Sequence, residues 1–269
     1  MDGAWALYEA WVRLQAGDID TALVFGSGKS SPGNLSEIYP LQLDPYTLTP
    51  LGVDPASMAA LQARALIDAG LVTEREMAQV VARNRRDAMN NPRAQVSGDF
   101  DEDALLAEPY LTAPLRKHDL PPISDGACAV ILATADKARA VCERPVWIRG
   151  IDHRIEVHQP GMRDLTVSSS TQIAGKNAGV GNAPVDVAEL CVSFSHEESV
   201  LRRALGLAEN VKVNPSGGPL SANPLMAVGI SRFAEAARQI AEQGAHRAIA
   251  HASSGQALQQ NMVAVLEGD

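Results

Sequence analysis

The sequence is poor in cysteine and contains no long apolar run and no long basic run. Its three cysteines, Cys128, Cys142 and Cys191, form no CxxC pair and no disulfide framework, which predicts a protein of the reducing cytoplasm. An apolar run such as Ala127–Ala133 is far too short to span a bilayer, so we expect no membrane association. No basic region followed by an apolar region opens the sequence, and no secretory signal is expected.

The balance of charge argues against a nucleic-acid partner. The 269 residues carry a formal net charge of −9 at pH 7, whereas proteins that bind nucleic acids concentrate lysine and arginine on one face. No spaced cluster of histidine, cysteine and aspartate predicts a metal site. Hydrophobic residues make up 46% and charged residues 20%, which is typical of a soluble globular protein.

Predicted strands alternate with predicted helices, which favours an α/β fold with a sheet covered on both faces. Residues 30–54 are rich in proline, glycine and serine and are expected to be irregular, and Gly26–Gly28 is expected to be a loop. Helices are predicted over residues 4–16, 55–69, 73–89, 134–142, 168–179, 196–205 and 224–243. Strands are predicted over residues 20–25, 121–133, 146–155, 185–192, 248–251 and 260–266.

The length fits one large domain or two smaller ones. We place a boundary near residue 144, between a first domain over residues 1–143, with a loop region at about 30–115, and a second over residues 144–269. The chain opens with a helix that leads into a strand, as though entered in the middle of a fold. The first domain is therefore expected to be incomplete.

The most specific motif lies between Val213 and Gly229 and contains Asn-Pro-Ser-Gly-Gly. The pair Gly217 and Gly218 lets the backbone approach a ligand closely. Pro224 stands where a helix begins, because its missing N–H is not needed there. On its own, this pattern fits an ordinary tight turn equally well.

This stretch resembles the thiolase signature, in which Asn-x-x-Gly-Gly is followed by Gly-His-Pro. The thiolase half of sterol carrier protein x reads Asn-Pro-Ser-Gly-Gly here. Ile123–Leu132 resembles the Ser-Asp-Gly-Ala strand of the superfamily, and Arg83–Gln95 resembles a loop that ends in Asn-Pro-x-Ala-Gln. Asp186–Phe194 resembles an Asp-x-x-Glu-Leu-His-Asp-x-Phe strand, and Ala4–Gly28 resembles the helix after the nucleophile with its following strand. The resemblance implies a thiolase-like fold with layers in the order α-β-α-β-α.

The resemblance also implies which residues stand at the reacting positions. A thiolase uses a cysteine nucleophile, a histidine that activates it, and a second cysteine for proton transfer. The counterpart of the nucleophile would lie at or before Met1, and Asn223 replaces the histidine of Gly-His-Pro. Residues 250–257, where the second cysteine would stand, contain no cysteine. We therefore expect the usual thiolase catalytic residues to be absent.

Three residues are candidates for catalysis: His251, Cys191 and Asn223. Four residues are candidates for binding the coenzyme A thioester: Ser216, Gly217, Gly218 and Ser253. Each has a structural alternative, since a buried cysteine often serves only as a small apolar side chain and a histidine next to a strand can be a satisfied core residue.

The expected function is that of a thiolase-like acyl-CoA-handling protein in lipid or steroid metabolism. It would be an acyl-CoA C-acyltransferase or an enzyme of the retro-aldolase type. The alternative is a non-catalytic protein that binds acyl-CoA or lipid, or a structural subunit of a thiolase-like complex. The coenzyme A thioester would be a substrate, with no permanently bound cofactor. The resemblance implies a homodimer and allows a small OB-fold partner protein.

Overall fold

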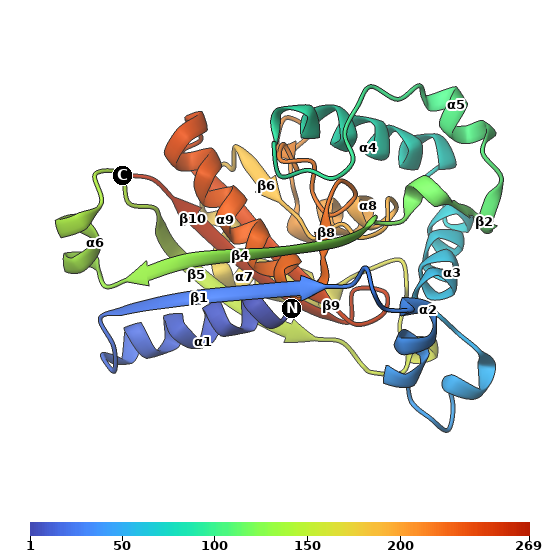
Figure 1. Ribbon diagram of the computed structural model, residues 1–269, viewed down its shortest axis with the longest axis horizontal. Helices are drawn as coiled ribbons and strands as arrows, with labels where there is room; N and C mark the ends of the chain where they lie inside the picture. Colours follow the sequence, from blue (N-terminus) through green and yellow to red (C-terminus); the bar gives the residue numbers. More distant parts are fainter.

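Helices and strands alternate along the chain and stack in layers (Figure 1). The computed structural model describes the backbone of residues 1–269 and every side chain except those of Ser36 and Gln42. The helices are α1 (Asp2–Ala16), α2 (Leu35–Ile38), α3 (Pro55–Asp68), α4 (Glu74–Asp87), α5 (Glu102–Ala107), α6 (Ala135–Val141), α7 (Ser169–Ala178), α8 (Glu197–Leu205) and α9 (Leu225–Gln243). The strands are β1 (Thr21–Lys29), β2 (Tyr110–Thr112), β3 (Leu115–Arg116), β4 (Ile123–Ala133), β5 (Trp147–Ile155), β6 (Val187–Glu189), β7 (Lys212–Val213), β8 (Asn223–Pro224), β9 (Arg247–Ser254) and β10 (Gln260–Glu267).

The first sheet is a long two-stranded ribbon with a short third strand, in the order β1-β4-β8. β1 and β4 pair antiparallel along the whole length of β1, and β8 joins β4 in parallel. The loop predicted at Gly26–Gly28 is wrong, because these residues continue β1. A Cβ on Gly26 would lie 2.8 Å from the carbonyl oxygen of Met226, so these glycines let the strand approach α9 closely.

The second sheet has five strands in the order β5-β10-β9-β6-β7. The predicted final strand pair is confirmed as the antiparallel pair β9 and β10. β6 runs parallel to β9 and covers only Val187–Glu189, so the strand predicted over residues 185–192 is too long. The shortening matters because Leu190 and Cys191 leave the ladder and turn toward other partners.

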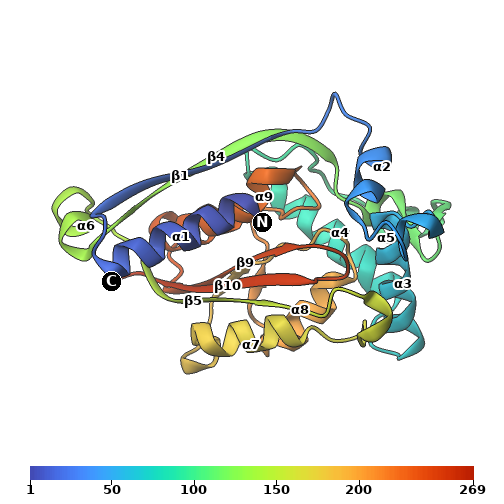
Figure 2. The same ribbon diagram turned by 90° about the horizontal axis from the view of Figure 1, so that it is seen from below.

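Helices α1 and α9 lie between the two sheets. In Figure 2, β1 and β4 run above these helices, β5, β9 and β10 run below them, and α7 and α8 cover the far face of the second sheet. Apolar side chains of α1 and α9, among them Leu7 and Ile230, pack with Met262 of β10 and Val24 of β1 in one core. No helix of the described residues covers the outer face of β1 and β4, so only the second sheet has the predicted cover on both faces.

The helices begin and end at the residues that their sequences indicate. Gly17 and Gly244 adopt left-handed conformations with φ of 78° and 79° and end α1 and α9. Thr73 and Glu76 form a capping box that starts α4. Residues 30–54 are less irregular than predicted, since α2 and two short 3₁₀ turns lie within them. No helix among the described residues is long and apolar enough to cross a membrane.

The predicted division near residue 144 falls between α6 and β5. The first sheet takes β8 from beyond that point, and α9 packs against both sheets. The division into two domains therefore remains a prediction.

Candidate functional site

The end of β6 and the middle of β9 bring three of the predicted residues together. Cys191 is 1% exposed and His251 is fully buried. The backbone N–H of Cys191 donates to Nδ1 of His251 over 3.3 Å. The hydroxyl of Ser253 donates to the carbonyl oxygen of Cys191 over 3.4 Å. Side chains from β9 therefore hold the backbone of Cys191 on both sides of its Cα.

The second ring nitrogen of His251 is also occupied. Nε2 lies 2.9 Å from Oδ1 of Asn261, and the amide of Asn261 donates to Ser170 and to the carbonyl oxygen of Leu258. Because Nδ1 accepts from a backbone N–H, the proton belongs on Nε2 and the ring is neutral. Burial lowers the pKa of His251 to about 4, although the hydrogen bond to Asn261 opposes the shift. In this arrangement the ring holds Cys191 in place, and its role in proton transfer remains a prediction.

The glycine-rich turn takes a left-handed backbone conformation that glycine and asparagine adopt most easily. Asn214, Gly217 and Gly218 have φ values of 51°, 93° and 61°. A Cβ on Gly218 would lie 2.6 Å from Nδ2 of Asn214, and a Cβ on Gly217 would lie 2.6 Å from the side chain of Ala88. The two glycines are thus required by the close packing of the turn, as well as by its dihedral angles.

A direct hydrogen bond connects this turn with the Cys191 cluster. Oδ1 of Asn214 accepts from the backbone N–H of Leu190 over 2.7 Å, and Leu190 precedes Cys191 in the chain. The turn therefore lies beside the end of β6. This hydrogen bond places the turn next to the segment that carries Cys191, although the two lie far apart in the sequence.

Asn223 lies at the end of the turn, in β8, and is 8% exposed. Its backbone N–H donates to the hydroxyl of Ser124 over 3.0 Å. Its side-chain oxygen is buried and has no hydrogen-bond partner within the described part of the chain, and the same holds for Nδ2 of Asn84 and of Asn214. Unpaired buried amides are costly, so each of these groups is an unused donor or acceptor in the interior.

Ser216, a predicted binding residue, points into the protein. Its backbone N–H and its hydroxyl donate to the two carboxylate oxygens of Glu189, over 3.1 and 2.7 Å. Arg232 of α9 donates to the same carboxylate over 2.7 Å. Sequence reasoning missed Glu189 and Arg232. The signal that could have found them is a charged residue at the end of an apolar strand, and another on the apolar face of a helix.

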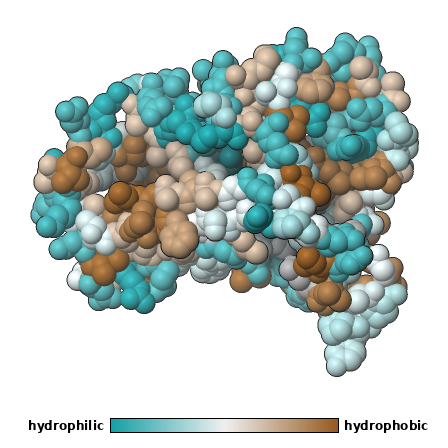
Figure 3. Space-filling model, in the orientation of Figure 1, coloured by the Kyte–Doolittle hydropathy of each residue, from teal (hydrophilic) through white to brown (hydrophobic). Residues whose placement is uncertain are grey.

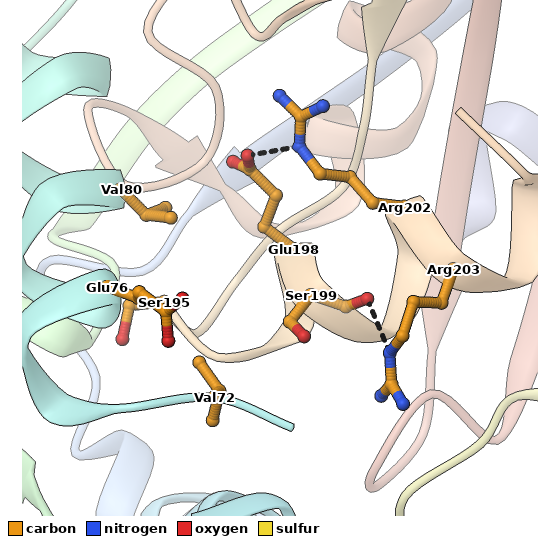
Figure 4. A pocket seen from close by; sticks show the side chains of 8 residues that line it. All are labelled: Val72, Glu76, Val80, Ser195, Glu198, Ser199, Arg202 and Arg203. Carbon is orange, nitrogen blue, oxygen red and sulfur yellow. Dashed lines mark hydrogen bonds and ion pairs between the residues drawn. The ribbon is translucent and has the colours of Figure 1, made fainter. Parts of the chain in front are cut away.

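A surface pocket of about 270 Å³ lies between α4 and α8, away from the predicted site (Figure 4). Val72 and Val80 form its apolar part, and Glu198 is ion-paired there with Arg202 and with Arg83. Arg203 donates to the backbone carbonyl oxygens of Ser199 and Thr166. The pocket contains none of the predicted site residues, and its charged groups are engaged with one another or with the backbone.

The sequence is similar to curated thiolase-type proteins, although no protein-family model matches it. It is 31% identical to the acetyl-CoA acetyltransferase of Methanothermobacter thermautotrophicus over 76% of this chain and 59% of that protein. It is 24% identical to sterol carrier protein 2 of Oryctolagus cuniculus over 97% of this chain and 54% of that protein. The chain thus spans a little more than half the length of these relatives.

Two solved structures share the fold. The Ltp2-ChsH2(DUF35) aldolase superposes with a TM-score of 0.81 at 18% identity, and covers 98% of this chain and 76% of its own. Human mitochondrial 3-ketoacyl-CoA thiolase superposes with a TM-score of 0.76 at 15% identity, and covers 100% of this chain and 77% of its own. The predicted thiolase-like α/β fold is therefore confirmed.

Proposed function

Because this chain belongs to the thiolase superfamily, we propose that it binds acyl-CoA thioesters and acts on them in lipid metabolism. One observation carries the proposal: the glycine turn is hydrogen-bonded to the end of β6 beside Cys191. The buried amide oxygen of Asn223 has no partner among the described residues, at the far end of the same turn. This is the kind of polar group that can orient a bound thioester.

The chemistry that suits these residues best is of the retro-aldol type. In this cleavage of a β-hydroxyacyl-CoA, a base, for which His251 is the candidate, takes the hydroxyl proton and the Cα–Cβ bond breaks. A polarised thioester stabilises the enolate, which then takes up a proton at Cα, so no cysteine nucleophile is needed. Rotation of the Asn223 amide exchanges its oxygen and its N–H₂ group, so this side chain can donate to the thioester oxygen. The other form of the same proposal is an acyl transfer between CoA thioesters. Its candidate nucleophile is Cys191, the cysteine that lies beside His251 and Ser253.

A second candidate is a protein that binds acyl-CoA without turnover. It is favoured by the saturated hydrogen bonding of His251, whose two ring nitrogens are both occupied. A base that must first break a buried hydrogen bond to the neighbouring backbone is poorly placed for proton transfer.

The test is direct. Purified protein is incubated with β-hydroxyacyl-CoA and with β-ketoacyl-CoA, and the loss of each is followed by chromatography, beside Asn223→Ala and His251→Ala. Turnover that falls in Asn223→Ala supports the enzyme. If calorimetry detects binding of the acyl-CoA but no substrate is consumed, the second candidate, a non-catalytic binder, is supported. If neither binding nor turnover is detected, the proposal is refuted.

We also propose that the protein forms a homodimer through the β1–β4 ribbon. β1 is an edge strand, and Leu23, Phe25 and Ile131 on the outer face of the ribbon are 68%, 67% and 76% exposed. Figure 3 shows apolar surface along the band where β4 and β1 run in Figure 1. A long apolar edge invites pairing with another chain. Analytical ultracentrifugation of wild type and Phe25→Asp tests this, and a monomeric wild type would refute it.

The remaining expectations belong to the same proposal. The DUF35 component in the name of the aldolase that shares this fold supports a small OB-fold partner, and a pull-down with a purified DUF35 protein tests it. The coenzyme A thioester is proposed as a substrate, with no permanently bound cofactor. The free cysteines support a cytoplasmic location.

A further inference from the structure

A buried ion pair lies directly beneath the glycine turn. Glu189 ends β6 and is fully buried, and Arg232 lies in α9 and is 5% exposed. Nη1 of Arg232 is 2.7 Å from Oε2 of Glu189. Burial raises the pKa of Glu189, and the charge of Arg232 opposes this shift. An apolar pair of similar size would pack there at less cost in desolvation, so stability alone is a weak reason for this ion pair.

Both members of this ion pair form hydrogen bonds with one residue of the turn, Ser216. Both carboxylate oxygens of Glu189 accept from Ser216, one from its backbone N–H and one from its hydroxyl. The same Nη1 of Arg232 also donates to the hydroxyl oxygen of Ser216 over 2.9 Å. Gly218 donates its backbone N–H to this oxygen over 3.3 Å. Ser216 is therefore fixed from below by two charged groups from two different elements.

The opposite side of the turn is held by the segment that follows α4. Nδ2 of Asn91 donates to the carbonyl oxygen of Ser216 over 2.9 Å. The backbone N–H groups of Gln95 and Val96 both donate to the carbonyl oxygen of Ser221 over 3.0 Å. Together with the ion pair, these groups connect the turn to β6, to α9 and to residues 91–96.

We propose that Glu189 and Arg232 are positioning residues that hold the turn in its binding conformation for the acyl-CoA thioester. The inference rests on the proposed function of the turn. Glu189 lies two residues before Cys191, and Ser216 lies seven residues before Asn223. The ion pair thus connects the two segments that carry the site residues, β6 through Glu189 and the turn through Ser216. Without it, Ser216 loses the hydrogen bonds that join the turn to β6 and α9, and the turn is held only from the side of residues 91–96.

α9 offers a matched control. Arg238, also in this helix, pairs with Glu235 over 2.7 Å, and its side chain is 22% exposed. Its hydrogen bonds and ion pairs among the described residues go to Glu235 and Glu242 of the same helix, and it acts on Glu189 only through its charge. Arg238→Met therefore removes an arginine ion pair from the same helix and keeps every hydrogen bond of the turn.

The experiment compares Arg232→Met, Glu189→Gln, the double variant Glu189→Gln/Arg232→Met and Arg238→Met. The binding of acetoacetyl-CoA is measured by calorimetry, folding by circular dichroism, and amide exchange over residues 212–222 by mass spectrometry. We expect Arg232→Met to raise the Kd by about tenfold or more, since small displacements in a binding site have large effects. Exchange of the 214–218 amides is expected to accelerate, and Arg238→Met is expected to match the wild type in both measurements.

The double variant separates positioning from folding. Removal of both charges leaves no unpaired buried ion, so its stability should return toward that of the wild type while its Kd stays raised and its 214–218 amides stay fast. Recovery of both binding and slow exchange would overturn the proposal, as would an equal loss of binding in Arg238→Met. If the wild type binds no acyl-CoA, the proposed function fails. The exchange measurement then still decides whether the pair holds the turn.

Discussion

The two large sheets pack against the same helices, α1 and α9, yet they differ in how they are covered. Strand β9 has helices on both faces, and Ile249 and Ala250 are completely buried. Strand β1 has helices on one face only, and Phe25 is 67% exposed on the other. Both strands read as apolar runs in the sequence. The comparison teaches that an apolar run identifies a strand, whereas the layers around it decide whether both of its faces are buried.

The largest difference between the two sheets is expected from a truncation in the core. Ile249→Ala leaves a cavity in β9, because helices fill the space on both sides, and we expect it to lower the free energy of unfolding by about 3 kcal/mol. Leu23→Ala in β1 removes an exposed side chain and should cost less than about 1 kcal/mol. Urea denaturation measures both, and equal costs would contradict the comparison.

A second difference is the dependence of stability on pH, because the second sheet contains a buried histidine, His251. The pKa of His251 in the folded protein, about 4, lies below the value of 6.5 for a free side chain. Between these values the unfolded chain binds the proton and the folded chain does not, so the stabilisation is complete above pH 6.5 and is lost as the pH falls toward 4.

At about 1.4 kcal/mol per pH unit, the wild type should lose about 2 kcal/mol between pH 6.5 and pH 5 through this residue. His251→Gln lacks the titration and should show a correspondingly flatter curve in urea denaturation at several pH values. Glu197, whose pKa burial raises to about 7, changes stability in the opposite direction, but it is present in both proteins and cancels in the difference. Parallel curves would show that His251 titrates normally.

The glycine turn is closely packed, like the second sheet, and Gly218 within it can be compared with Gly206, which ends helix α8 at the surface. Gly218 and Gly206 have nearly the same φ, 61° and 60°, but only Gly218 has side-chain atoms where a Cβ would lie. Both alanine variants bear the left-handed strain, and Gly218→Ala adds a clash with Asn214. We expect Gly218→Ala to be less stable than Gly206→Ala by about 1–2 kcal/mol in thermal unfolding. Equal melting temperatures would mean that the turn shifts at little cost to accommodate the added Cβ.

The smallest effect is expected on the uncovered face of the ribbon. Ile131 is 76% exposed, and Ile131→Thr keeps the β-branched side chain that a strand prefers. The free energy of unfolding at low protein concentration should change by no more than about 0.5 kcal/mol. Denaturation curves at two protein concentrations check this, and a larger loss confined to the higher concentration would indicate that this face is covered in a dimer.

Local patterns predicted the elements well and their contacts poorly. The helices over α1 and α9 and the strands β4, β9 and β10 follow from periodicity, apolar runs and glycine ends. The loop expected at Gly26–Gly28 failed, because a glycine in a strand can mark a close approach to another element as well as a turn. For the site, Cys191, His251 and Asn223 were named from the resemblance. Of the partners that hold them, Asn261 lies on the strand that pairs with that of His251, whereas Ser124 lies 99 residues before Asn223.

The sequence by itself determined the α/β class, the position of the glycine turn and the small residues that the turn requires, because these depend on neighbouring residues. Only the tertiary structure decided that Ser216 faces Glu189 and Arg232, and that both nitrogens of His251 are occupied. The physical reason is that a buried polar side chain must find its hydrogen bonds wherever packing brings a partner within reach. In this chain those partners lie on other strands and helices, from 10 to 60 residues away in the sequence.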